Sequence, residues 1–107
     1  MNKKTLYLND KNQKEVFSDN KRALVVFSAS WCGPCKMLSP VLDEISNSED
    51  LNTSIIRVDI DDSPLISSSM KIRTVPSIFY FKDGNPVEKF VESASKKNII
   101  QFIKNNE

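Results

Sequence analysis

Hydrophobic and polar positions follow two periods along this chain, one typical of strands and one typical of helices. Residues 23–29 form a nearly continuous apolar run, Ala-Leu-Val-Val-Phe-Ser-Ala, with the length of a strand that is covered on both faces. Residues 54–60 alternate instead, with three branched apolar residues on one face and Arg57 and Asp59 on the other. Both segments are therefore predicted to be strands.

A helical period follows the first of these strands and returns at the end of the chain. Residues 34–47 place four apolar side chains on one face, and Pro40 inside the segment predicts a kink. A closing helix, capped near Ser95, places three apolar side chains on one face. The apolar positions are Leu38, Val41, Leu42 and Ile45 in the first helix and Ile99, Phe102 and Ile103 in the second.

Shorter elements complete the order. Thr5 to Leu8 is predicted to be a strand, and the turn at Asn9-Asp10 is predicted to cap a helix that runs to about Phe17. Ser63 and Pro64 fit the cap and first position of a short helix over residues 65–70. Residues 77–81 and 86–91 read as a hairpin around a turn at 82–85. The order strand, helix, strand, helix, strand, helix, strand, strand, helix predicts an α/β mixed sheet with helices on both faces.

Length and charge narrow the class of protein. The 107 residues predict a single domain over 1–107, and 15 basic against 14 acidic residues give no reason to expect nucleic acid or a membrane as partner. The first ten residues lack the apolar core of a signal peptide, and no apolar stretch approaches a membrane span. We expect a soluble, cytoplasmic protein, with a monomer as the default state.

The two cysteines, Cys32 and Cys35, suggest redox chemistry. They close so short a loop that a disulfide between them restricts the unfolded chain very little, which makes a structural staple a poor explanation. A closed zinc site needs four ligands, and the chain has no histidine and no third cysteine, so no metal is expected. A redox dithiol or an accidental spacing remains.

The position of the pair favours the dithiol. It lies between a buried strand and the start of a helix, where unpaired N–H groups and the helix dipole stabilise a thiolate. Cys32 is therefore the predicted nucleophile. Cys35, about one turn further on and expected to be more protected from solvent, is the predicted resolving thiol.

The segment from Trp31 to Lys36, Trp-Cys-Gly-Pro-Cys-Lys, resembles the active-site segment of the thioredoxin family. Residues 72–77, Ile-Arg-Thr-Val-Pro-Ser, resemble the segment that carries a cis-proline opposite the dithiol in that family. Residues 81–84 resemble its hairpin turn, and the similarity extends over most of the chain from Ala23 onward.

The resemblance implies the thioredoxin fold, a five-stranded mixed sheet flanked by four helices, and the activity of a protein-disulfide reductase. In the implied cycle Cys32 attacks a disulfide-containing protein substrate and Cys35 releases the product. No bound cofactor is implied beyond the Cys32–Cys35 redox-active disulfide, and electrons are expected from NADPH through a thioredoxin reductase. Lys36 belongs to the active-site segment, and the implied substrate surface comprises Trp31, Gly33, Pro34, Val75 and Pro76, with Val91 and Glu92 nearby.

The chain departs from the family pattern at several positions, three of which bear on the chemistry of the dithiol. Val26 stands where thioredoxins usually carry a buried aspartate, so the expected proton acceptor for Cys35 is missing. Arg57 stands where a lysine is common, and we hypothesise that it helps to hold Cys35 as a thiolate; pairing with Asp59 or Asp61 at the surface is the alternative. Glu92 replaces a glycine and would disfavour acidic substrates if it lies close to Cys32, or have no effect if it points outward.

Two other functions stay open beside general disulfide reduction. The missing aspartate is compatible with a specialised or slow oxidoreductase that has a narrow partner. A binding module that uses the thioredoxin shape for docking, with a dispensable dithiol, is the alternative from another class.

Overall fold

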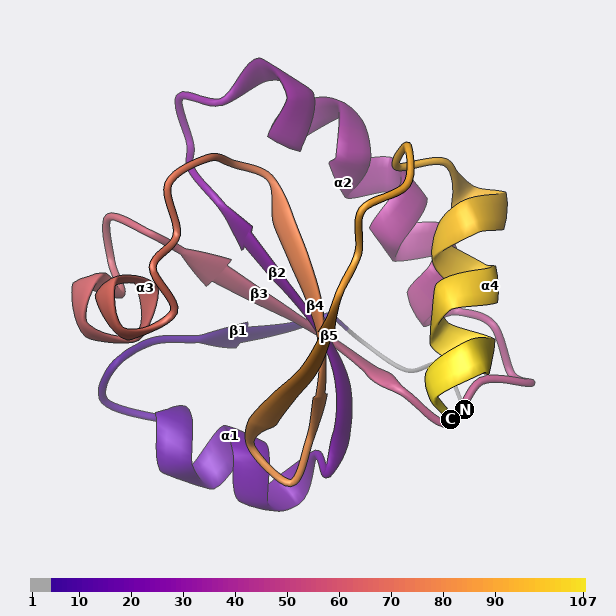
Figure 1. Ribbon diagram of the computed structural model, residues 1–107, viewed down its shortest axis with the longest axis horizontal. Helices are drawn as coiled ribbons and strands as arrows, with labels where there is room; N and C mark the ends of the chain where they lie inside the picture. Colours follow the sequence, from indigo (N-terminus) through magenta and orange to yellow (C-terminus); the bar gives the residue numbers. More distant parts are fainter. Residues whose placement is uncertain (1–4) are drawn as a thin grey trace.

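The computed structural model describes residues 5–107, in which a five-stranded sheet lies between two pairs of helices (Figure 1). The strands are β1 (Leu6–Leu8), β2 (Arg22–Ser28), β3 (Ser54–Asp59), β4 (Ser77–Lys82) and β5 (Asn85–Lys89). The helices are α1 (Gln13–Asp19), α2 (Gly33–Ser46), α3 (Pro64–Ser69) and α4 (Lys96–Asn106). The element order and the thioredoxin fold expected from the sequence are confirmed.

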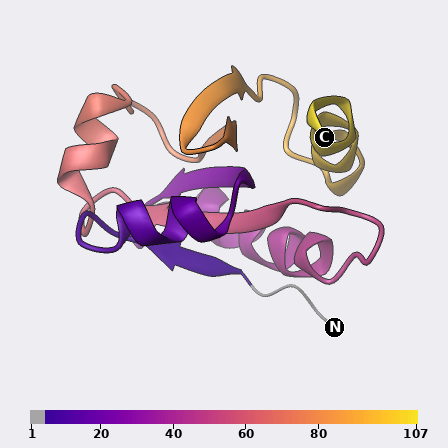
Figure 2. The ribbon, with the colours of Figure 1, turned by 90° about the horizontal axis from the view of Figure 1, so that it is seen from below.

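The sheet is mixed, and its strand order is β1-β3-β2-β4-β5. The strands β1, β3 and β2 pair in parallel, whereas β4 pairs antiparallel with β2 and with β5. Figure 2 shows β1 at the lower edge of the sheet and the β4–β5 hairpin at the upper edge. The apolar run of the sequence is thus the central strand β2, where the parallel and antiparallel parts of the sheet meet.

Alternating side chains of the sheet pack into two separate hydrophobic cores, one on each face. Leu24 and Val26 pack with residues of α2 and α4, whereas Val25 and Phe27 pack on the other side with residues of α1 and α3. Figure 1 shows α2 and α4 together on one side of the sheet and α1 and α3 on the other. The face toward α2 therefore carries the side chains at every second position of β2 and β3, including Arg57.

Several boundaries differ from the predictions by a few residues. The first helix begins at Gln13 instead of directly after Asn9-Asp10, because the Asn9 side chain accepts hydrogen bonds from the N–H groups of Lys11 and Asn12 and forms a turn. The last strand ends at Lys89 rather than at residue 91. The helix α2 begins at Gly33 and continues through Pro40 to Ser46.

The capping of the helices is partly as predicted. Ser95 caps α4, since its side chain accepts a hydrogen bond from Asn98 N–H at 3.1 Å. Ser63 occupies the cap position of α3, but its hydroxyl donates to the Leu8 carbonyl, so the prediction that it caps this helix is wrong. The carboxylate of Asp10 accepts from the first N–H groups of α3 instead. A residue distant in sequence thus does the work expected of Ser63.

Candidate active site

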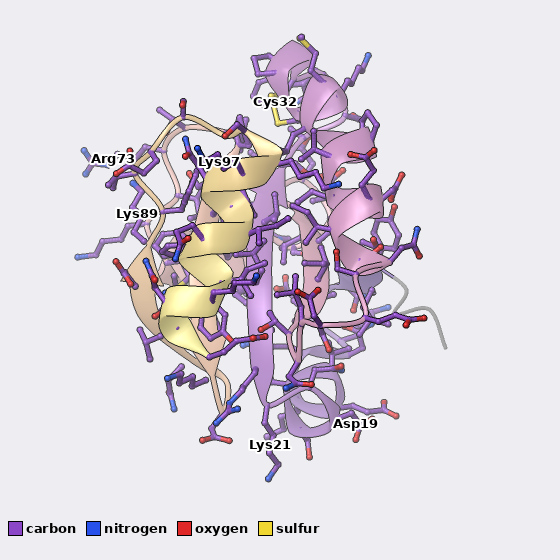
Figure 3. All side chains as sticks on the ribbon, turned by 90° about the vertical axis from the view of Figure 1, so that its right-hand side faces the viewer. Asp19, Lys21, Cys32, Arg73, Lys89 and Lys97 are labelled. Atoms are coloured by element: carbon purple, nitrogen blue, oxygen red, sulfur yellow. A yellow bond between two sulfur atoms is a disulfide. The ribbon has the colours of Figure 1, made fainter. Side chains whose placement is uncertain are left out.

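The dithiol lies at the N-terminal end of α2, just after β2, and is oxidised. Cys32 and Cys35 form a disulfide with their Cα atoms 5.3 Å apart. Figure 3 shows this bond at one end of the molecule, at the opposite end from Lys21 and Asp19. The strand-to-helix placement expected from the sequence is therefore confirmed.

The start of α2 directs a backbone donor at Cys32. Cys32 is the N-cap residue, in an extended conformation, and the N–H of Cys35 donates to Cys32 Sγ at 3.2 Å. Pro34 contributes no N–H to this turn, so fewer donors of the first turn compete for a partner. A donor and a helix N-terminus directed at Sγ favour negative charge on this sulfur.

The two cysteines are almost equally buried, with 5% of Cys32 and 9% of Cys35 exposed. The prediction that Cys35 is the more protected residue is therefore wrong. The reason is that the Val75 carbonyl oxygen covers Cys32 Sγ at 3.7 Å, whereas Cys35 lines a hollow that Cys32 does not line. The burial of Cys32 by Val75 could not be predicted from the local sequence, because the two residues are 43 positions apart.

The segment before β4 lies against the dithiol. The Val75–Pro76 peptide bond is cis, as the resemblance implied, and both residues are half-buried. Val75 packs against the small cluster that contains the two cysteines and Ala29. The structure thus brings Val75 and Cys32 together across a separation of 43 residues.

The expected substrate surface is exposed around the dithiol. Trp31 is 67% exposed, Gly33 and Pro34 are also exposed, and the indole Nε1–H of Trp31 donates to Asp61 Oδ2 at 3.1 Å. Met37 is a further large exposed apolar side chain on α2 that the sequence reading did not select. Met37 could have been identified from the sequence, because it is an apolar residue outside the predicted buried face of an amphipathic helix.

Val91 and Glu92 lie in a different hollow from the cysteines. They line a space of about 300 Å³ between the end of β5 and α4, together with Phe90 and Phe102. Val91 is 82% exposed and Glu92 is also exposed. The sequence left the orientation of Glu92 open, and its exposure agrees with an outward orientation.

Arg57 is buried in the layer between β3 and α2. Only 12% of its side chain is exposed, and its guanidinium donates to Ser39 Oγ at 2.6 Å, to the Ser39 carbonyl at 3.2 Å and to Asp43 Oδ1 at 2.8 Å. The alternative expectation that it pairs with Asp59 or Asp61 is wrong. The side chain reaches toward α2 because its strand position faces that helix, and the acceptors there lie 14 and 18 residues away.

A hollow of about 200 Å³ connects Arg57 with Cys35. Its polar lining includes Ser28 at the end of β2, Asp59 at the end of β3 and Lys36 and Ser39 on α2. A larger hollow of about 590 Å³ lies at the other end of the molecule, beside Asp19 and Lys21, and neither cysteine lines it. The smaller hollow is the one that bears on the chemistry.

Neither a metal centre nor a membrane span emerges from the part of the chain that the structure describes. Within residues 5–107, His, Cys, Asp and Glu side chains do not gather in groups of three that could hold a metal ion. No helix in the same range has the length and apolar character that crossing a bilayer requires.

Comparison with known proteins agrees with this geometry. The thioredoxin family profile matches residues 4–105. The thioredoxin of Staphylococcus saprophyticus is 39% identical over 90 residues, which cover 81% of this chain and 86% of that protein. The thioredoxin of Mycobacterium tuberculosis is 37% identical over 89 residues, covering 83% of this chain and 77% of that protein.

A solved structure gives the same result in three dimensions. A mutant thioredoxin from Halobacterium salinarum is similar with a TM-score of 0.83 and 31% sequence identity, covering 95% of this chain and 89% of that one. The sequence match, the shared fold and the disulfide at the start of α2 point to the same conclusion. The chain belongs to the thioredoxin family and is a thiol-disulfide oxidoreductase.

Proposed function

We propose that this protein reduces disulfide bonds in other proteins, with Cys32 as the attacking thiol and Cys35 as the resolving thiol. The observation that carries the proposal is the hydrogen bond from Cys35 N–H to Cys32 Sγ at the start of α2. A donor held there stabilises the Cys32 thiolate, which is the form that attacks a disulfide. It also offers the same stabilisation when Cys32 is the leaving group as the protein is recharged.

The proposed reaction is two successive thiol-disulfide exchanges. The Cys32 thiolate attacks one sulfur of the substrate disulfide, and the other substrate sulfur leaves as a thiolate that takes up a proton. Cys35 then loses its proton and attacks Cys32 Sγ, which breaks the mixed disulfide and releases the second substrate thiolate. The substrate gains two electrons, and the protein ends with the Cys32–Cys35 disulfide.

The substrate surface in this proposal surrounds the disulfide. Trp31, Gly33 and Pro34 offer an exposed and largely apolar contact area beside it, and Val75 and Pro76 border it on the other side. We assign backbone pairing with an extended substrate segment to the groups beside Pro76.

Supporting roles are proposed for residues near this surface. Lys36 and Arg57 are cations that line the hollow beside Cys35 and favour its thiolate. Val91 and Glu92 are proposed as outer contacts of larger substrates, since both are exposed and follow β5.

The proposed reductant is NADPH, delivered through a thioredoxin reductase in the cytoplasm. The family membership supports this partner, and the substrates are proposed to be proteins whose disulfides have formed under oxidising conditions. A monomer is the proposed working form. A reducing compartment suits the cycle because the Cys32–Cys35 disulfide must be reopened after every turnover.

Reduction of insulin disulfides tests the proposal. Turbidity from precipitating insulin chains is followed with dithiothreitol as reductant and, in parallel, with a thioredoxin reductase and NADPH. Activity in both formats, and none from Cys32→Ser in either, is the expected result. If the unmodified protein reduces insulin with neither reductant, the proposed function is overturned.

A narrow partner range is the second candidate, because apolar Val26 lies where the family usually carries an acid. Activity with dithiothreitol but not with the reductase would favour this specialised oxidoreductase. A docking module with a dispensable dithiol would be favoured if Cys32→Ser retained the biological effect.

A further inference from the structure

The second exchange step needs a group that takes the proton from Cys35. A thiol attacks a disulfide only as its thiolate, so the S–H bond of Cys35 must break before the mixed disulfide can be resolved. Val26, which faces the same α2 layer, is apolar and only 1% exposed. The acceptor must therefore be another side chain near Cys35.

Cys35 lines a hollow of about 200 Å³. It is open to solvent, and its volume exceeds the roughly 30 Å³ that one water molecule occupies in the liquid. Its lining contains three charged side chains besides the cysteine, namely Lys36, Arg57 and Asp59. The two cations have no lone pair to accept a proton at neutral pH, so Asp59 is the base available on this wall.

The backbone holds the carboxylate of Asp59 in place at the end of β3. Its Oδ1 accepts hydrogen bonds from the N–H groups of Asp61 at 2.8 Å and Asp62 at 3.4 Å. Oδ2 makes none of the hydrogen bonds found between described residues. Asp59 stands opposite Ser28 in the parallel register of β2 and β3, and Ser28 lines the same hollow.

We propose that Asp59 is the proton acceptor for Cys35, acting through water in this hollow. The proton leaves Cys35 Sγ and reaches Oδ2 of Asp59 along a hydrogen-bonded water or the Ser28 hydroxyl. The electron pair left on Cys35 forms the bond to Cys32 Sγ, and the substrate sulfur departs with the pair of the broken bond. Asp59 then returns its proton to solvent through the mouth of the hollow.

The neighbouring charges support this assignment. Arg57 and Lys36 stabilise the thiolate that forms on Cys35. Asp43, the other carboxylate near Arg57, does not line the hollow and is engaged with the guanidinium. Asp59 therefore differs from the other acids of this region by facing the same space as Cys35.

The test separates the two exchange steps with the aromatic disulfide dithionitrobenzoate. Attack by Cys32 releases one thionitrobenzoate, and attack by Cys35 on the mixed disulfide releases the second, so stopped-flow absorbance records two phases. In Asp59→Asn we expect an unchanged first phase and a second phase slowed about tenfold or more near neutral pH. The asparagine keeps the Oδ1 acceptor for the two N–H groups, so the turn after β3 is preserved.

The pH dependence distinguishes a proton acceptor from a structural residue. The slowing of the second phase in Asp59→Asn should become smaller as the pH rises past the usual thiol pKa of about 8.5, because hydroxide then removes the Cys35 proton without a carboxylate acceptor. The titratable and charged groups that face Cys35 are Lys36, Arg57, Asp59, Tyr7 and Cys32. Asp62→Asn is the matched control, because Asp62 belongs to the same turn after β3 as Asp59 but does not line this hollow.

The inference rests on the proposed roles of Cys32 and Cys35, and Cys35→Ser tests those roles separately. This variant should release a single thionitrobenzoate; a second equivalent would overturn both the assignment of Cys35 and the role of Asp59. If Cys35→Ser behaves as expected, the proposed roles stand. An unchanged second phase in Asp59→Asn, or equal slowing in Asp62→Asn, would then overturn the role of Asp59 alone.

Discussion

Arg57 on β3 and Asp43 on α2 form an ion pair with 2.8 Å between Nη2 and Oδ1. The arginine is largely buried while the aspartate side chain is 64% exposed, so solvent weakens the pair from one side only. The pair holds a permanent cation at the wall of the hollow that Cys35 lines. The packing of α2 on β3 therefore places a positive charge near the resolving thiol, Cys35.

Arg57→Met should raise the pKa of the Cys35 thiol, because a cation near a thiolate stabilises it. The pH dependence of Cys35 alkylation, followed in a Cys32→Ser background, measures this directly. Arg57→Lys, which keeps the charge, should retain most of the effect, although lysine lacks the planar fork that binds Ser39 and Asp43 together. An unchanged Cys35 pKa in Arg57→Met would contradict the electrostatic role.

Val26→Asp should accelerate the second exchange step at a cost in stability. Val26 stands next to Arg57 in the register of β2 and β3, so a carboxylate there would have a cation beside it. Taking a charge into this core still carries a desolvation penalty, and we expect a loss of a few kcal/mol in the free energy of unfolding. Urea unfolding and the two-phase thionitrobenzoate assay measure the two effects.

Val26→Asn is the matched control for this substitution, since it has nearly the same shape and cannot accept a proton at neutral pH. It should lose stability without any gain in rate. A gain of similar size in both variants would show that the effect comes from altered packing rather than from a base.

Tyr80 should make stability fall at alkaline pH. Its side chain is fully buried, and burial raises its pKa above the ordinary value of 10.0. Because the folded protein holds this proton more tightly than the unfolded chain, the stabilisation is complete below about pH 10 and is lost as the pH rises through the raised pKa. Urea unfolding across this range measures the loss, and Tyr80→Phe should show a shallower decline.

The same variant should cost about 1 kcal/mol near neutral pH, from the loss of one buried hydrogen bond. Thr53 Oγ1 donates to Glu107 Oε2 at 2.7 Å, so the proton in the 2.7 Å contact between Thr53 and Tyr80 comes from the tyrosine. Tyr7→Phe provides the comparison, because Tyr7 is exposed and should leave the alkaline decline as it is. A parallel pH profile for Tyr80→Phe and the unmodified protein would refute the assignment.

Glu92→Gln should shift preference among substrates by a small factor. Glu92 is exposed in the segment after β5, so its charge acts through solvent, and we expect a gain of no more than about twofold in kcat/KM for disulfide peptides with acidic flanks. Peptides with basic flanks should change in the opposite direction, and both shifts should disappear in high salt. Equal changes for the two peptide sets would show that charge is not the cause.

Local patterns determined most of the secondary structure. The apolar run of β2, the alternation of β3 and the helical spacing in α2 and α4 were readable because each segment is long enough to repeat its period. The ends of the helices and strands were harder to predict from the sequence. Asp10 caps α3 from 55 residues away, a relationship that leaves no trace in the local sequence around Ser63.

The sequence by itself determined the identity of the dithiol, because a pair of cysteines at the junction of a strand and a helix depends only on neighbours in the chain. Its surroundings depended on tertiary structure. Val75 covers Cys32, Arg57 turns to Asp43, and Asp59 shares a hollow with Cys35 only because β3, β4 and α2 are packed around β2. Exposure and charge are set by distance in space, so only the folded chain decided how far each cysteine is buried and which carboxylate shares a hollow with Cys35.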